Sequence, residues 1–202
     1  MSYVLVIFGA YLLGSSSMSF YLSKIKGVDI RKKGSKNLGA SNAMILLGWK
    51  AGVLVGIHDI GKAVLAVLAA KLMFPELPYI GVIAGVASVL GHIFPFYLKF
   101  KGGKGFASFV GMLLALNWRY ALILIVVIAL VTLLTDYIVC GTVTAVVVSP
   151  VYFGIAEKNI IFPLILLIAT GVILYKHREN FVRIYKGTEI GFRSANRGEH
   201  RA

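Results

Sequence analysis

Long runs without a charged residue constrain this chain more than any other feature of its sequence. Residues 3–22 carry no charge, and about 20 helical residues rise about 30 Å, the thickness of a bilayer's hydrocarbon core. Similar runs recur to residue 176, and 58% of all residues are hydrophobic, against about 45–50% in soluble domains. A lipid bilayer is the natural solvent for so much apolar surface, so the sequence predicts an all-α membrane protein.

The apolar runs predict about seven transmembrane helices within a single integral membrane domain, residues 1–202. The fourth run is shorter than a span requires, so we expect it to tilt, to cross a thin part of the membrane or to re-enter. The predicted segments are 3–22, 51–73, 79–98, 106–117, 120–135, 138–156 and 160–176.

The basic residues predict the orientation of these helices. With the amino terminus outside, 17 of the 21 lysines and arginines fall in inner segments and three in outer turns. Cytoplasmic segments carry the excess of Lys and Arg in membrane proteins, so we expect a cytoplasmic carboxyl terminus with a basic tail, 177–202. The net charge of +13 suits anionic headgroups and phosphorylated substrates. The hydropathy favours membrane lipids over nucleic acid as partners. Cys140, the single cysteine, excludes an internal disulfide.

Residues 100–106 combine three glycines with two lysines between two apolar segments. Glycine lets backbone N–H groups turn inward, and the next helix would add unpaired N–H groups and the positive end of its dipole. Lys101 and Lys104 add full charges. This stretch, with Gly102, Gly103 and Gly105, predicts a cradle for phosphate or another oxyanion.

Two further polar stretches lie on the same predicted membrane face. Residues 33–42 hold Ser35, Asn37 and Asn42 among glycines and lysines, and form either an anion nest or a flexible solvated loop. His177 and Asn180 share one face of a helix leaving the membrane, where a histidine can carry a proton near neutral pH. The alternative is a basic helix that binds headgroups non-specifically. We expect Glu189 to pair with a nearby arginine.

Charged and polar residues also fall inside predicted spans. Asp59 and Lys62 share a helix face and can neutralise each other, either as functional groups or as a packing ion pair. His92 is a candidate base, but we expect a buried histidine bonded to a carbonyl that Pro95 frees. We expect Pro95 to kink its helix.

These motifs, taken in order, closely resemble the bacterial acyl-phosphate-dependent glycerol-3-phosphate acyltransferases of the PlsY type, over essentially the whole chain. The resemblance implies a plasma-membrane enzyme of phospholipid synthesis, with its active site facing the cytoplasm. It moves an acyl group from acyl phosphate to the 1-hydroxyl of glycerol 3-phosphate and makes lysophosphatidic acid. We expect a monomer without metal or cofactor. By resemblance, Ser35, Lys104, His177 and Asn180 are catalytic, and Asn37, Asn42, Lys62, Gly102, Gly103, Gly105 and Glu189 bind substrate.

The resemblance also suggests how the substrates lie. We expect the donor phosphate on the amides of residues 102–105 and on Lys104, and the acceptor and carbonyl near Ser35, Asn37, His177 and Asn180. The base is either the donor's own phosphate or His177. Acyl phosphate is already activated, so the site needs position and charge stabilisation more than a covalent nucleophile.

Departures from the family pattern, among them Ala63 after Lys62 where glycine is common, keep other functions open. The family usually has an arginine where this chain has the apolar stretch around Ile45, and Lys36 replaces a usual glycine. Lys36 can compensate as a point charge. The alternatives are a relative with another acceptor, a non-catalytic protein that binds anionic lipid, and a small transporter or scramblase. Acyl transfer, binding without turnover, and flux of a phosphorylated solute distinguish them.

Overall fold

A computed structural model describes residues 1–196, and over that range its regular elements are all helices. Six segments are long and apolar enough to cross a membrane, and the helix Phe106–Leu116 is apolar but shorter. The predicted all-α membrane fold is therefore confirmed. The chain divides into two compact units, Met1–Leu116 and a second from Asn117 onward. The six segments are Ser2–Ile25, Trp49–Met73, Ile80–Leu98, Trp118–Thr135, Ile138–Ala156 and Ile161–Tyr185.

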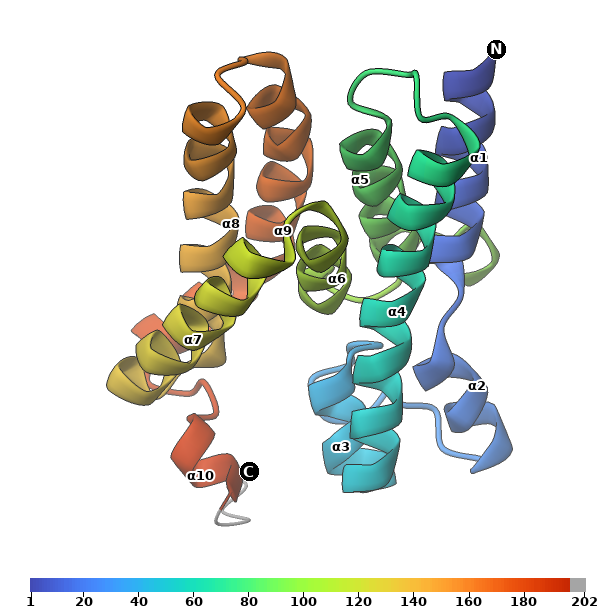
Figure 1. The fold of residues 1–202 in the computed structure, drawn as a ribbon. Helices are drawn as coiled ribbons and strands as arrows, with labels where there is room; N and C mark the ends of the chain where they lie inside the picture. Colours follow the sequence, from blue (N-terminus) through green and yellow to red (C-terminus); the bar gives the residue numbers. More distant parts are fainter. Residues whose placement is uncertain (197–202) are drawn as a thin grey trace. The chain divides into compact units, whose positions relative to one another are not determined.

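The first unit packs its helices around α5 (Ile80–Ile93), the most buried of the candidate spans (Figure 1). α1 (Ser2–Ser15) and α4 (Trp49–Met73) both pack on α5, and α6 (Phe106–Leu116) packs on α4 and α5. The shorter helices α2 (Met18–Ile25) and α3 (Ala40–Leu47) pack against α4.

Glycines bring these helices into close contact. A Cβ at Gly14 would overlap the Ser88 backbone, and one at Gly91 would overlap the Tyr11 carbonyl. A Cβ at Gly111 would overlap the backbone of Ile60. Small residues at these crossings allow the backbone-to-backbone packing that associates helices in a membrane.

The first span is interrupted, where the sequence predicted one continuous helix over 3–22. α1 ends at Ser15, and α2 begins at Met18. Ser17 has an extended backbone and its hydroxyl accepts a hydrogen bond from the Phe20 N–H. A serine at this position caps a new helix, so the polar run at residues 15–17 divides the apolar segment.

Pro95 ends its helix rather than kinking it. α5 stops at Ile93, and a single 3-10 turn, η1 (Phe96–Leu98), follows the proline. Proline disfavours helical geometry in the residue before it. The Tyr11 hydroxyl donates to the Phe94 carbonyl (2.7 Å) and satisfies an acceptor left at this helix end.

The second unit packs α8 (Ile138–Ala156) against α7 (Trp118–Thr135) and α9 (Ile161–Tyr185). Tyr120, Tyr152 and Phe153 stack or meet edge to face between α7 and α8. α9 continues to Tyr185, past the predicted end at 176, and therefore carries both His177 and Asn180. The short helix α10 (Phe192–Asn196) follows.

Candidate active site

The loop that carries Ser35 is organised by one buried amide. The Asn42 side chain is 1% exposed, and its Nδ2 donates to the carbonyls of Ile30 (2.9 Å), Lys33 (3.3 Å) and Asn37 (3.0 Å). Its Oδ1 accepts the Ser35 N–H (3.0 Å). Both ends of the amide are therefore committed to the loop backbone. In place of the predicted substrate contact, we assign Asn42 a positioning role behind Ser35.

Around that amide the loop presents polar groups outward. Ser35 and Lys36 are exposed, and Asn37 is half-buried. Gly34 has a positive φ, and a Cβ there would overlap the Asn42 Oδ1. Lys36 also has a positive φ (55°), a left-handed conformation that costs a non-glycine residue about 1 kcal/mol. A lysine thus occupies a backbone position suited to glycine.

An ion pair neutralises one of the cations that precede this loop. Arg31 Nε and Nη2 donate to the two carboxylate oxygens of Asp29, at 2.9 and 3.2 Å. The Arg31 guanidinium holds the pKa of the Asp29 carboxyl below its usual value. Arg31 therefore contributes less positive charge to an anion than the exposed lysines do.

The glycine–lysine stretch corrects one prediction. The Gly102 N–H donates to the Ile93 carbonyl (3.0 Å), and the Gly103 N–H donates to the His92 carbonyl (3.1 Å). Two of the amides expected to hold phosphate are therefore used to anchor the stretch on the end of α5. Glycine is needed at both positions because a Cβ on Gly102 would overlap the His92 carbonyl, and one on Gly103 would overlap the His92 ring.

The start of α6, shortly after Gly103, has features that suit an anion. Gly105 has φ +93°, which favours glycine, and its carbonyl accepts the Phe109 N–H in the first turn of α6. The first N–H groups of a helix lack partners within it and lie at the positive end of the dipole. Half-buried Lys104 directly precedes this turn. The arrangement favours an anion at Lys104 and the start of α6.

Lys62 lies at the centre of a buried charged cluster with Asp59 and His92. Its Nζ lies 3.0 Å from Asp59 Oδ1 and 2.9 Å from His92 Nδ1, and it donates to the Ser16 carbonyl at 2.7 Å. An ammonium has three N–H donors, so all three are engaged inside the protein. Lys62, 3% exposed, is placed to support structure rather than to make the predicted substrate contact. The expected Asp59–Lys62 ion pair is present.

His92 has a different partner from the one the sequence suggested. It is buried as expected, but its Nδ1 faces Lys62 and lies 3.4 Å from Asp59 Oδ1.

In the second unit, the fold selects one tautomer of His177. The buried ring has its Nδ1 2.8 Å from the Ile173 carbonyl, one turn earlier on α9. A carbonyl only accepts, so Nδ1 carries the hydrogen and the neutral ring keeps its lone pair on Nε2. That nitrogen can accept a hydrogen bond or a proton.

Asn180 is oriented by Glu189. Asn180 Nδ2 donates to Glu189 Oε1 and Arg183 Nε donates to Glu189 Oε2, each at 2.6 Å. The predicted pairing of Glu189 with a nearby arginine is confirmed. This geometry gives Glu189 a positioning role toward Asn180, and its contact with substrate stays a prediction.

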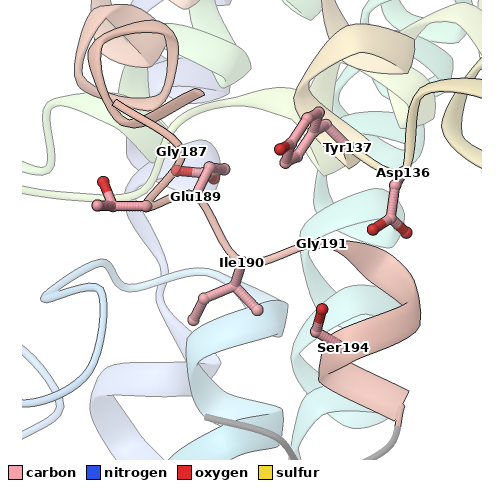
Figure 2. Close-up of a pocket in the computed structure, with 8 residues that line it drawn as sticks. Asp136, Tyr137, Gly187, Glu189, Ile190, Gly191 and Ser194 are labelled. Atoms are coloured by element: carbon pink, nitrogen blue, oxygen red, sulfur yellow. The ribbon is translucent and has the colours of Figure 1, made fainter. Parts of the chain in front are cut away.

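The segment that carries Glu189 is held against the α7–α8 turn. Glu189, Ile190 and Gly191 line a cavity of about 140 Å³ together with Asp136 and Tyr137. Figure 2 draws these lining residues. The Asp136 backbone carbonyl accepts the Phe192 N–H (2.7 Å), and its carboxylate accepts the Arg193 N–H (2.9 Å). The sequence did not predict this docking. These two hydrogen bonds to Asp136 fix the segment from which Glu189 accepts the hydrogen bond of Asn180.

The six apolar helices are those of a membrane protein. The start of α6 beside Lys104 and the polar loop that carries Ser35 have groups that suit a phosphorylated ligand. In the part of the chain that the structure describes, no group of three or more histidine, cysteine or acidic side chains could hold a metal ion.

Comparison with known proteins identifies the family. The model of the glycerol-3-phosphate acyltransferase family matches residues 4–187, so the chain belongs to this family. It is 39% identical over 193 residues to a glycerol-3-phosphate acyltransferase of Clostridioides difficile, covering 93% of this chain and 94% of the relative. A Pelagibacter ubique enzyme of the same description is also 39% identical, over 91% of this chain and 94% of its own.

Two solved structures share the fold. Both are PlsY (YgiH), an integral membrane glycerol 3-phosphate acyltransferase, and both are 34% identical to this chain. The glycerol 3-phosphate form matches with a TM-score of 0.90, over 97% of this chain and 98% of its own. The lysophosphatidic acid form matches with a TM-score of 0.85, over 95% of each. That Ser35, Lys104, His177 and Asn180 act in one reaction stays a prediction.

Proposed function

We propose that this protein is a glycerol-3-phosphate 1-O-acyltransferase that uses acyl phosphate as donor. The observation that carries the proposal is the match, over nearly the whole chain, to an integral membrane acyltransferase solved in a glycerol 3-phosphate form. A product form of the same protein, with lysophosphatidic acid, is equally similar in sequence. The membrane spans suit both the acyl donor and the lysolipid product.

The proposed reaction needs one bond made and one broken at the acyl carbon. The 1-hydroxyl oxygen of glycerol 3-phosphate bonds to the carbonyl carbon of acyl phosphate, and the bond from that carbon to the phosphate oxygen breaks. Inorganic phosphate leaves with its bonding electron pair. The hydroxyl proton goes either to the phosphate of the donor or to Nε2 of His177, whose tautomer leaves that nitrogen unprotonated.

Residues of the first unit are proposed to bind the anions. Lys104 and the first turn of α6 would hold the donor phosphate, because a full charge and unpaired N–H groups lie together there. Ser35 and Asn37 would contact the acceptor from the loop that Asn42 organises. Lys36, exposed beside Ser35, would supply the charge that the family's arginine near position 45 usually provides.

In the second unit, Asn180 would orient a substrate hydroxyl or carbonyl. Its amide nitrogen is held by Glu189, so its Oδ1 keeps a fixed direction. A fixed direction matters because a small misplacement of a reacting group can cost about 10²-fold in rate.

We further propose that the enzyme lies in the bacterial plasma membrane as a monomer, with its active site facing the cytoplasm. The distribution of lysines and arginines supports that orientation. It also supplies positive charge where phosphorylated substrates and anionic headgroups occur.

An acceptor panel tests this proposal. Purified protein in lipid is given acyl phosphate with glycerol 3-phosphate, glycerol or another phosphorylated alcohol, and products are identified by mass spectrometry. We expect 1-acyl lysophosphatidic acid as the main product. A folded protein that acylates another acceptor in preference would reassign the substrate. Binding of acyl phosphate without turnover would remove the enzymatic role.

A further inference from the structure

We propose, resting on the function above, that the buried Asp59–Lys62–His92 cluster is a positioning assembly that holds the two anion-binding loops of the first unit in place. The loops are residues 33–42, which carry Ser35, and residues 99–105, which carry Lys104. The cluster itself lies within α4 and α5 and is nearly inaccessible to solvent.

His92 connects the cluster to the glycine–lysine loop. Its Nδ1 side faces Lys62 and Asp59, and its other edge lies against Gly103, where an added Cβ would overlap Nε2. The His92 carbonyl also accepts the Gly103 N–H. The backbone carbonyl and the ring of His92 therefore both fix Gly103, which directly precedes Lys104.

Ser16 connects the same cluster to the serine–asparagine loop. The Lys62 ammonium donates to the Ser16 carbonyl, and His58 Nε2 lies 2.8 Å from the Ser16 hydroxyl. Ser16 lies at the break between α1 and α2. At the second residue of α2, the Ser19 hydroxyl donates to the Leu38 carbonyl (2.9 Å), inside the loop that Asn42 also holds. Lys62 thus fixes Ser16, the first residue in a chain of contacts that ends at Leu38, four residues before Asn42.

The chemistry of the cluster favours a role in geometry over a role in stability. Burying charges is costly, and well-packed apolar residues of similar volume often stabilise a protein as well or better. Directional contacts from one ammonium on α4 to α5 and to the break between α1 and α2 give what apolar packing does not, a defined distance between these segments. The donors of Lys62 are all engaged, so the cluster acts on substrate only through the loops.

A size-compensation experiment tests the link through His92. Gly103→Ala adds a methyl group against the imidazole, and His92→Ala opens the space that this methyl needs. We expect Gly103→Ala to weaken binding of a non-reactive acyl phosphonate by about tenfold, as overpacking displaces the loop. In His92→Ala/Gly103→Ala the dissociation constant should return to within about threefold of that of His92→Ala alone.

The matched control is Gly81→Ala, whose methyl meets mainly the flexible end of Lys71 at the other end of α5. It should leave phosphonate binding unchanged. Wild-type affinity in Gly103→Ala, or losses that simply add in the double variant, would overturn the proposal.

A paired variant tests the link through Lys62. Asp59→Asn/Lys62→Met removes both charges together and leaves neither buried alone. We expect it to fold and to raise KM for both glycerol 3-phosphate and acyl phosphate by about fivefold or more, because both loops lose their common support. KM values unchanged for both substrates would overturn the link.

Chemical labelling of Lys104 tests the position of the loop without depending on enzyme activity. The rate of reductive methylation of Lys104, read by peptide mass spectrometry, reports loop geometry without any substrate. We expect Gly103→Ala to change that rate and the double variant to restore it. If the wild type forms no lysophosphatidic acid, the proposed function fails, and the methylation rates still decide whether His92 positions the loop.

Discussion

Glu189→Gln is the substitution for which the structure gives the sharpest expectation. The Glu189 carboxylate accepts from two donors at once, Asn180 Nδ2 and Arg183 Nε, each at 2.6 Å. A glutamine keeps one acceptor oxygen and turns its NH₂ group toward the other donor. Either Asn180 or Arg183 must therefore lose its partner.

The size of the effect follows from burial and charge. Hydrogen bonds to a charged group are each worth about 1.5–3 kcal/mol. Arg183 is 36% exposed and Glu189 14%, so water screens the ion pair and the lower end of that range applies. We expect the free energy of unfolding to fall by about 1–2 kcal/mol. We expect kcat to fall by about 10²-fold, because Asn180 loses its fixed orientation.

The assay is lysophosphatidic acid formation under saturating substrates, measured beside thermal unfolding in the same detergent. Glu179→Gln is the matched control, since Glu179 lies on α9 directly before Asn180, undergoes the same charge change and is 72% exposed. It should change neither kcat nor the unfolding temperature. If Glu189→Gln unfolds at a lower temperature but keeps kcat within about threefold of wild type, Glu189 serves stability alone and the orientation of Asn180 does not depend on it.

Three further substitutions test separate parts of the account. Lys104→Met keeps most of the length of the side chain and removes its charge, so kcat/KM for acyl phosphate should fall by about 10²-fold or more. A kcat/KM within about tenfold of wild type would remove Lys104 from the phosphate site. Lys36→Asn places a residue that tolerates the left-handed backbone at this position, so the unfolding temperature should not change. KM for glycerol 3-phosphate should rise by about tenfold because a positive charge is lost. An unchanged KM would show that Lys36 does not replace the family's arginine. Gly111→Ala should lower stability by about 1–3 kcal/mol, because the methyl meets the Ile60 backbone, whereas Gly171→Ala, with open space around it, should be tolerated in the same thermal scan.

The helical spans could be predicted because hydropathy and length decide them. The short apolar helix at 106–116 was also recognisable from its length. The break at Ser16 and Ser17 was not predicted, because the surrounding residues are apolar and the carbonyl it exposes is satisfied by Lys62, far away in sequence. The end of α5 before Pro95, instead of a kink, likewise depends on a tertiary contact, from Tyr11 to Phe94.

The residue types of the candidate site were readable from the sequence, but their tasks were not. Polar and glycine residues between spans indicated anion binding, and they include positions that anchor the loops instead. Asn42, Lys62, Gly102 and Gly103 all direct their donors at backbone carbonyls or buried side chains. A sequence shows that a donor exists and does not show which acceptor takes it.

Donor selectivity distinguishes acyl phosphate from other activated donors. We propose that the donor is bound through its phosphate at Lys104 and the start of α6, so the protein needs no covalent nucleophile. Initial rates are compared for acyl phosphate and acyl-CoA of the same chain length, with glycerol 3-phosphate as acceptor and purified protein in lipid. The account predicts lysophosphatidic acid from acyl phosphate alone, with loss of that product in Lys104→Met. Equal rates from acyl-CoA, or no product from acyl phosphate with the protein folded, would contradict it.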